Sequence, residues 1–335
     1  MGFAIAPWLF ALLGLYLYLY PWSVLLVALD MVPAWGAWMG GLLLIVQGTV
    51  LGLWLTVNYG WRGVLVSLLI LVLSWAVEHI GVLTGFPFGS YVYTDVLGMK
   101  IFGVVPLAVP FAWLLVVPAS IGVIEWLFRR GTDERPQPRT RRHTLLKMLG
   151  AASLALLLDV GIEPVSVYIN NYWVWGQEIH EGFYGVPAEN FVAWWVTSFM
   201  LAGVYYAILP PASRSSTPAT QRTRHLVAAM RGAWLAFLAQ PLAIKWRTIW
   251  QVCNTPGTQH PAYNWLPPLF YLLTLVLLMI TNLAHGKLEA GAIGALVLGY
   301  LVLVYLEPRL EQWIMQHAPQ PAAEPLEAEA QRNRQ

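Results

Sequence analysis

Three acidic residues lie within or at the end of long apolar segments, where an ionised side chain is costly. Glu78 falls in LILVLSWAVEHIGVLTG, and both Asp159 and Glu163 fall in LALLLDVGIEPVSVY. An ionised Asp at the centre of a membrane helix costs roughly 2.5–3.5 kcal/mol, so such residues usually face the protein interior and serve a function. Asp159 and Glu163 are four residues apart, which places both on one face of a helix. The pattern predicts a buried group of carboxylates.

A structural role for these carboxylates is the simpler alternative. They are then helix caps or ion-pair partners of His79, Lys100 or Arg231. One carboxylate is enough to cap a helix end. Since Asp159 and Glu163 lie on adjacent turns, a functional role for the pair is favoured over a structural one. Glu125, close to the Arg129-Arg130 pair, is instead predicted to form a salt bridge at the membrane interface.

Aromatic residues gather in the two loops that follow these carboxylates. Seven of them are candidate substrate contacts: Tyr91, Tyr93, Trp173, Trp175, Tyr184, Trp194 and Trp195. Interfacial belts of Trp and Tyr are ordinary in membrane proteins, but they do not explain clustering beside all three carboxylates. Turn-forming Gly and Pro residues predict that the loops fold back over the membrane. A carboxylic acid under an aromatic lid is suited to protonating an apolar alkene, because ring faces stabilise the cation that forms.

The composition shows what must position these residues. Of 335 residues, 58% are hydrophobic and 11% are charged, whereas roughly a quarter of a soluble domain is charged. Uncharged stretches include 1–29, 31–61, 101–124, 190–213 and 248–286. A helix needs about 20 apolar residues to cross the hydrocarbon core of a bilayer. The fold class predicted is therefore all-α, a polytopic transmembrane helix bundle.

The apolar runs predict about 8–9 spans. They lie near residues 8–29, 35–57, 63–83, 101–127, 146–168, 190–209, 227–244, 267–283 and 292–307. Residues 1–312 are expected to form one membrane domain that carries the active site. Residues 313–335 are rich in Pro, Ala and Glu and are expected to form a short disordered tail.

The Lys and Arg residues of the short loops set the expected orientation. Loop 129–147 is rich in arginine and is predicted to be cytoplasmic, and loop 210–226 agrees with it. Loop 169–189 has no Lys or Arg, so it is predicted to lie outside, together with loop 84–100. The protein is therefore expected to be a multi-pass protein of the cell inner (cytoplasmic) membrane, with the carboxylates toward its outer face.

Several other function classes fit the sequence poorly. The net charge of only +2 does not favour binding to the negatively charged backbone of a nucleic acid. The lone Cys253 excludes multi-cysteine metal sites, and no Gly-rich phosphate loop or internal repeat is found. A metal site built from Glu78 with His79, His180 and His260 is a lesser alternative. No metal and no cofactor is predicted.

Two segments, 78–113 and 158–195, resemble the membrane-integral carotenoid 1,2-hydratases. The resemblance covers the core from about residue 60 to 210. It implies cofactor-free addition of water to the terminal C1=C2 double bond of an acyclic or monocyclic carotenoid, such as lycopene, γ-carotene or a bacterioruberin precursor. The partners it implies are this carotenoid, water, membrane lipids and other enzymes of carotenoid synthesis. Glu163-Pro164 stands where the family pattern has Asp-Pro, which leaves the acid in place with one more methylene of reach.

The reaction assigns roles to these residues. An alkene is a poor base, so the proton donor must be a neutral carboxylic acid, and Asp159 is the candidate. Glu78 or Glu163 is the candidate base that orients water. Three aromatic residues, Trp173, Trp175 and Tyr184, are expected to line the cation, and Asn190 is expected to hold water or a carboxylate.

Two alternatives remain open at this point. A carotenoid end-group cyclase needs the same acid and the same cation but no bound water. A non-catalytic carotenoid- or lipid-binding membrane protein would stack its aromatic residues on a polyene and use the carboxylates for structure only.

Overall fold

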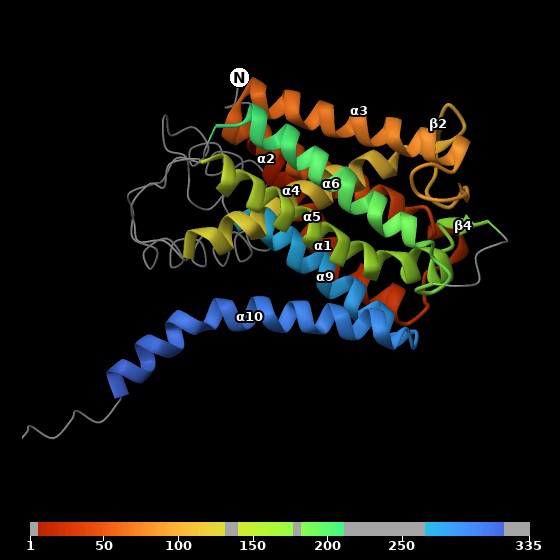
Figure 1. Ribbon diagram of the computed structural model, residues 1–335. Helices are drawn as coiled ribbons and strands as arrows, with labels where there is room; N and C mark the ends of the chain where they lie inside the picture. Colours follow the sequence, from red (N-terminus) through yellow and green to blue (C-terminus); the bar gives the residue numbers. More distant parts are fainter. Residues whose placement is uncertain (1–5, 131–139, 177–181, 211–264, 318–335) are drawn as a thin grey trace, which may run out of the picture. The chain divides into compact units, whose positions relative to one another are not determined.

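The computed structural model describes residues 6–130, 140–176, 182–210 and 265–317 (Figure 1). The chain divides into two compact units, residues 1–294 and 295–335, and the helix bundle considered below belongs to the first. The predicted span 227–244 and the tail after residue 317 lie outside the described residues. So do Arg231, Cys253, His180 and His260.

The described part of the chain contains eight helices that are long and apolar enough to cross a membrane. They are α1 (Ala6–Ala28), α2 (Met39–Tyr59), α3 (Trp61–Thr84), α4 (Ala108–Arg130), α5 (Arg141–Pro164), α6 (Ala188–Ile208), α9 (Leu266–Ala284) and α10 (Leu288–His317). A short 3-10 turn, Ala34–Gly36, precedes α2. The predicted all-α polytopic bundle is confirmed.

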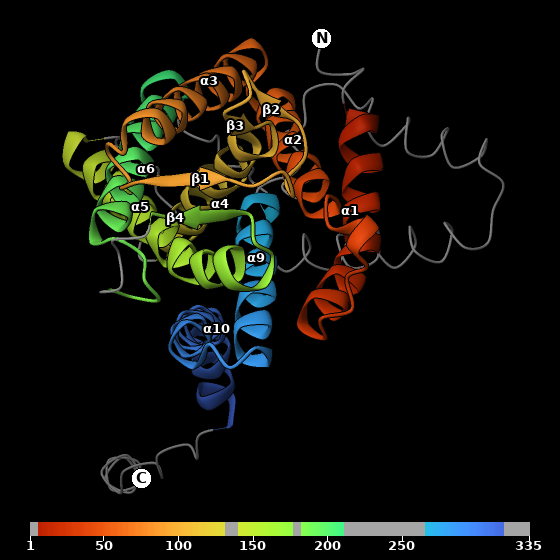
Figure 2. The same cartoon turned by 90° about the vertical axis from the view of Figure 1, so that its right-hand side faces the viewer.

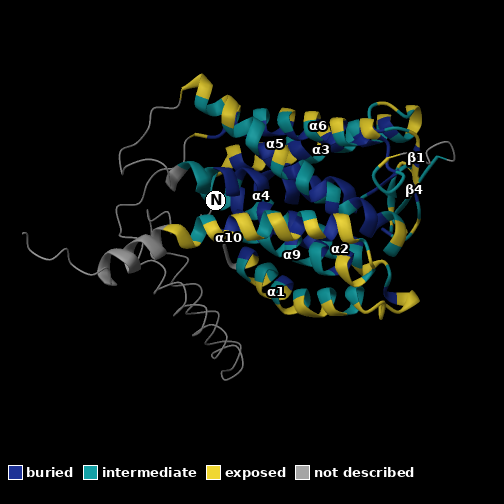
Figure 3. Cartoon of the chain, turned by 60° about the horizontal axis from the view of Figure 1, so that its bottom comes forward, coloured by how far each residue is buried: buried dark blue, intermediate teal, exposed yellow. Residues whose placement is uncertain are grey.

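Helix α4 lies at the centre of the bundle and packs against α2, α3, α5 and α9 (Figure 3). Small residues allow these close approaches. A Cβ atom on Gly48 of α2 would lie 2.4 Å from the carbonyl oxygen of Phe111, and one on Gly122 would lie 2.5 Å from Pro267 of α9. The glycines therefore set the distances between the central helix and its neighbours.

Two short strands lie across the end of the bundle at which α3 and α5 finish (Figure 2). Strand β1 (Tyr91–Tyr93) pairs antiparallel with β4 (Trp173–Trp175), with Tyr91 opposite Trp175 and Tyr93 opposite Trp173. The pairing joins the α3–α4 loop to the α5–α6 loop. Both loops therefore fold back over the end of the helix bundle, and their position relative to the membrane stays a prediction.

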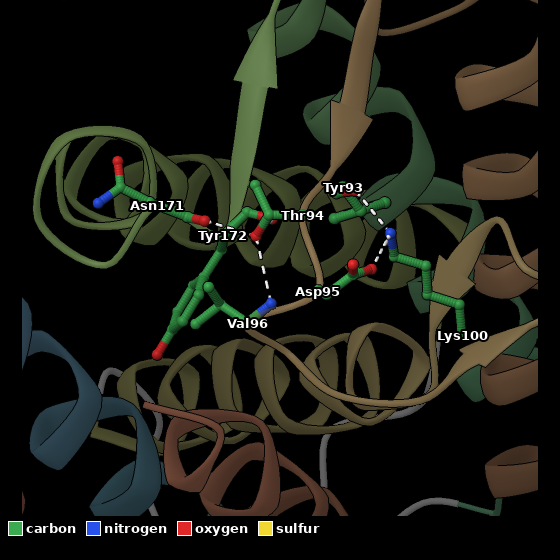
Figure 4. A network of polar contacts seen from close by, with 7 residues as sticks. All are labelled: Tyr93, Thr94, Asp95, Val96, Lys100, Asn171 and Tyr172. Carbon is green, nitrogen blue, oxygen red and sulfur yellow. Dashed lines mark hydrogen bonds and ion pairs between the residues drawn. The ribbon is translucent and has the colours of Figure 1, made fainter. Parts of the chain in front are cut away.

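Polar contacts extend this pairing beyond the strands (Figure 4). The Thr94 N–H donates to the Tyr172 carbonyl at 3.0 Å, and the Thr94 hydroxyl donates to the Asn171 carbonyl at 2.6 Å. Lys100 donates to the Tyr93 carbonyl at 2.8 Å and pairs with Asp95 at 2.7 Å. The suggested ion pair of Lys100 with Glu78 is therefore wrong, because the partners of Lys100 are Tyr93 and Asp95 of its own loop.

The fourth predicted span began too early, at residue 101. Residues 100–106 form a hairpin instead, in which β2 (Lys100–Ile101) pairs antiparallel with β3 (Val105–Pro106). Phe102 and Gly103 turn the chain with φ values of 51° and 73°. The apolar residues of this hairpin looked like a continuation of the helix, but α4 begins only at Ala108.

Candidate active site

All three carboxylates of the apolar segments are buried at the β1–β4 end of the bundle. The exposed fractions are 4% for Glu78, 0% for Asp159 and 1% for Glu163. Glu163 lies 22 residues after Arg141, the first residue of α5, which places it about 33 Å along the helix axis from the arginine-rich end. The predictions that these residues face the interior and lie opposite the arginine-rich end are confirmed.

Glu78 is held by three hydrogen-bond donors. Its Oε2 accepts hydrogen bonds from the hydroxyls of Tyr91 at 2.5 Å and Tyr93 at 2.8 Å. Its Oε1 accepts one from the Trp113 indole at 2.9 Å. Residues 91 and 93 reach the same carboxylate because alternate side chains of a strand share a face.

Glu163 is also held by three donors, at the end of α5. Its Oε2 accepts hydrogen bonds from the indole N–H groups of Trp173 and Trp175, each at 3.2 Å. Its Oε1 accepts one from the Asn190 amide at 2.8 Å. The expectation that these two tryptophans point to the same face is confirmed, and the shared target is a carboxylate.

Asp159 lies one helical turn deeper and has far fewer partners. Its Oδ2 accepts a hydrogen bond from the Asn190 amide at 3.3 Å, and Oδ1 accepts none from the described residues. Asn190 of α6 therefore bridges Asp159 and Glu163 of α5. This bridge joins α5 to α6 at the height of Asp159 and Glu163.

A small cavity of about 20 Å³ lies between Glu78 and Glu163. Its lining consists of Glu78, Phe88, Tyr91, Tyr93, Glu163, Trp173, Trp175, Asn190 and Trp194. A cavity of about 10–15 Å³ or more, with two to four polar partners, holds a water molecule. The cavity therefore has the size and the polar lining for one water, and it is too small for the end of an isoprenoid chain.

The two tyrosines remain protonated in this environment. Burial and the neighbouring Glu78 carboxylate both raise the pKa of Tyr91 and of Tyr93 above the ordinary value of a phenol. Their hydroxyls are thus hydrogen-bond donors to Glu78 across the physiological pH range.

Comparison with known proteins decides the family. Residues 39–247, more than half of the chain, match the family of carotenoid biosynthesis proteins. The chain belongs to this family. It is also 31% identical over 122 residues to the bisanhydrobacterioruberin hydratase of Haloarcula japonica, an alignment that spans 36% of this chain and 37% of that relative. No solved structure matches the chain.

Two predicted site residues of this carotenoid biosynthesis protein lie away from the cavity. The Tyr184 hydroxyl donates to Glu289, and its carbonyl accepts a hydrogen bond from Tyr168 at 2.7 Å. The indole of Trp195 donates to Ser153 at 3.2 Å. Both residues were predicted from their nearness in sequence to the carboxylates, but their side chains point elsewhere. Asp159 does not line the cavity either, although it contacts Asn190, which does.

Two residues of the site were not predicted. Trp113 donates to Glu78 and stacks on Trp194, with ring centroids 4.1 Å apart. Phe88 is buried and packs edge-to-face on Tyr91. Trp113 lies 35 residues after Glu78 on another helix, so no spacing rule connects them. A signal did exist for Trp113, because it ends the segment 78–113 that carries the family resemblance.

The remaining acidic and histidine residues have other surroundings. Glu125 forms the predicted salt bridge, with Lys147 at 2.9 Å. His79 packs against Trp75 and Phe102, with ring centroids 5.1 and 6.3 Å from its own. Within the described residues, no group of three His, Cys, Asp or Glu side chains is arranged to hold a metal ion.

Proposed function

We propose that the protein adds water across the terminal C1=C2 double bond of an acyclic carotenoid end and produces a tertiary 1-hydroxy group. The observation that carries this proposal is the water-sized cavity between two buried carboxylates, with a third carboxylate one turn below. Membership of the carotenoid biosynthesis family and similarity to a protein named as a hydratase support it.

The reaction proceeds in two proton transfers. A neutral carboxylic acid gives its proton to C2, so that the cation forms at the more substituted C1. Water then attacks C1, and a carboxylate accepts the proton that the water loses. The net change is addition of one water molecule, and the proton passes back to the acid before the next cycle. No redox partner is required.

Asp159 is the proposed proton donor. Glu78 and Glu163 each accept three hydrogen bonds, which stabilise a negative charge, whereas Asp159 accepts one long bond and has an unpartnered oxygen among the described residues. Asp159 is therefore the carboxyl group that most readily carries the proton in this group. It also lies outside the cavity, so the acid and the water face different sides of Asn190.

Glu78 is the better candidate for the base that accepts the proton of the water. Its phenol partners can turn and accept a hydrogen bond themselves, because a hydroxyl is both donor and acceptor. The donors to Glu163 Oε2 are indole N–H groups, which can only donate. Glu163 is then proposed to hold the water and to stabilise the cation by its charge.

Aromatic faces provide the remaining stabilisation of the cation. Trp173, Trp175 and Trp194 line the water-sized cavity, and Trp113 stacks on Trp194 from behind it. A cation over an aromatic face gains about 0.5–2 kcal/mol. These rings also exclude bulk water, which strengthens the charge interactions inside the site.

The substrate class and location follow as parts of the same proposal. An end group of the lycopene, γ-carotene or bacterioruberin-precursor type carries the required isolated trisubstituted double bond. The arginine-rich end of α4 and α5 is proposed to face the cytoplasm, in the inner membrane of the cell. The site would then open toward the outer leaflet.

Expression in a lycopene-producing bacterium tests the function. Hydration adds the mass of one water molecule for each end that reacts, which mass spectrometry of the extracted pigment detects. An unchanged mass with a ring in the product would indicate cyclisation instead. Unchanged pigment, from a strain whose membranes contain the folded protein, would favour a binding protein without catalysis.

A further inference from the structure

A second hollow lies on the outer surface of the bundle, at the seam between α5 and α6. It has a volume of about 230 Å³ and is lined by Leu156 of α5 and by Phe191, Val192 and Trp195 of α6. The one polar atom of these side chains, the indole nitrogen of Trp195, is engaged with Ser153. The lining is thus entirely apolar. We call it the seam groove.

The seam groove leads to the acidic group along both helices. Leu156 precedes Asp159 by three residues and Glu163 by seven, which is about 4.5 and 10.5 Å along the helix axis. On α6, Phe191 and Trp195 directly follow Asn190 and Trp194, the two residues of this helix that line the water-sized cavity. One face of α6 therefore lines the cavity, and the adjacent face lines the groove.

Asn190 lines the water-sized cavity, and the next residue, Phe191, lines the groove. Its amide contacts Asp159 at 3.3 Å and Glu163 at 2.8 Å, which joins α6 to α5 at the top of the groove. Asp159 is fully buried and lines neither hollow, so a molecule in the groove reaches the carboxylates only after the contacts between α5 and α6, including the Asn190 bridge, have opened.

We infer that the seam groove binds the apolar polyene chain of the carotenoid next to its reactive end, and that this end reaches the carboxylates laterally from the bilayer. The inference rests on the proposed function. The groove is an open apolar hollow of about 230 Å³, in which a branched apolar segment can contact Leu156, Phe191 and Trp195. The rest of the polyene leaves the groove at its exposed mouth beside Val192 and lies in the surrounding lipid.

This arrangement assigns a side to each reactant. The alkene arrives from the groove, where Asp159 is the nearest acid. The water arrives from the cavity, where Glu78 and Glu163 hold it. The two meet at Asn190, so protonation and water attack occur from different directions, and water stays away from the polyene chain.

A matched pair of substitutions on α6 tests the groove. Val192→Trp fills it, because Val192 lines the groove and is 63% exposed at its mouth. Val196→Trp adds the same bulk one turn further along the helix, at a 47% exposed position outside the lining. Each variant is assayed with a full-length acyclic carotenoid and with a ten-carbon terpene alcohol that carries the same end group.

We expect Val192→Trp to lower kcat/KM for the carotenoid about tenfold more than for the short alkene, since only the long substrate needs the groove. Val196→Trp is expected to change kcat/KM by the same factor for the two substrates. An equal effect of Val192→Trp on both substrates would overturn the inference and would leave the hydratase function intact.

A binding measurement separates failure of the groove from failure of the function. A photo-cross-linking amino acid is placed at position 192 or 196, and membranes that contain the carotenoid are irradiated. We expect a carotenoid adduct at 192 in excess of 196. If that adduct forms without any hydration by the wild-type protein, the groove stands and the proposed function fails. Lipid adducts alone at position 192 would overturn the groove.

Discussion

The two halves of the site, one around Glu78 and the other around Glu163, are built to the same plan. In each half a glutamate near the end of one helix receives two aromatic donors from the next strand and one donor from the next helix. The first half comprises α3, β1 and α4, and the second comprises α5, β4 and α6. The corresponding donors are Tyr91, Tyr93 and Trp113 in the first half and Trp173, Trp175 and Asn190 in the second.

Antiparallel pairing relates the two strands, β1 and β4, by a local two-fold rotation. The first aromatic residue of each strand lies opposite the second of the other, with Val92 facing Val174 between them. The sequence shows no repeat, because none of the three corresponding donors is the same residue type in the two halves. The likeness is one of geometry.

The halves differ where chemistry requires them to differ. Four residues before Glu163 stands Asp159, whereas four residues before Glu78 stands Ser74, which is buried and donates to the Leu71 carbonyl at 3.3 Å. Oε2 of Glu78 faces two hydroxyl groups, which can also accept a hydrogen bond, and Oε2 of Glu163 faces two indole N–H groups, which can only donate. In the proposed mechanism, Asp159 is the acid, Glu78 is the base whose donors can reverse, and Glu163 is the carboxylate that stays charged.

The largest expected effect concerns the extra acid. Asp159→Asn keeps the size of the side chain and removes the transferable proton, so hydration should fall about 10²–10⁴-fold. Ser74→Ala, at the corresponding position of the other half, should leave hydration close to wild type. Pigment analysis and the yield of folded protein are measured together for both variants. Near-normal hydration by Asp159→Asn would remove it from the mechanism, and failure of that variant to fold would support a structural role.

The next largest effect is a difference in thermal stability between the Glu163→Gln and Glu78→Gln variants. Glu163→Gln must keep its carbonyl toward the indoles of Trp173 and Trp175, so its N–H₂ faces Asn190, which can accept it only by turning its amide and withdrawing its hydrogen bond from Asp159. In Glu78→Gln, by contrast, the Tyr91 and Tyr93 hydroxyls can turn to accept the N–H₂. A buried donor left unsatisfied costs about 1–3 kcal/mol. We therefore expect Glu163→Gln to have the lower thermal midpoint in detergent of the two. The reverse order would contradict the distinction between reversible and fixed donors.

A smaller effect is expected at the tryptophans of β4. Replacing Trp173 or Trp175 by Phe removes a donor to Glu163 and weakens the ring quadrupole, and Leu removes the aromatic face as well. A cation–π contact of about 0.5–2 kcal/mol corresponds to roughly three- to thirtyfold in rate. Turnover should therefore follow the order Trp, Phe, Leu. Equal turnover of the Phe and Leu variants would limit each tryptophan to its hydrogen bond.

The smallest effect is expected at Tyr184, outside both halves. Its hydroxyl donates to Glu289, and Lys287 lies 4.0 Å from the ring centroid of the neighbouring Tyr168. Tyr184→Phe removes only this peripheral bond, so hydration should remain near the wild-type rate in the pigment assay. A loss comparable with that of the β4 variants would restore Tyr184 to the list of residues that contact the cation.

The sequence predicted the fold better than it predicted the contacts. Long uncharged runs locate most spans because the bilayer requires them, and the start of α4 was misplaced because an apolar hairpin has the same composition. The cost of burying charge identified Glu78, Asp159 and Glu163. Trp113 was missed, because its contact with Glu78 depends on how α4 packs against α3. Trp195 was included because it neighbours Trp194, although adjacent residues of a helix point in different directions.

The order of the donors along the chain bears on how the protein enters the membrane. Among the described residues, the donors to Glu78 lie within residues 91–113, and the donors to Glu163 lie within residues 173–190. During synthesis, each glutamate can thus obtain its full set of partners as soon as the next hairpin of helices has left the translocon. The first hairpin need not wait for the second, and the pairing of β1 with β4 becomes the step that joins two already satisfied halves.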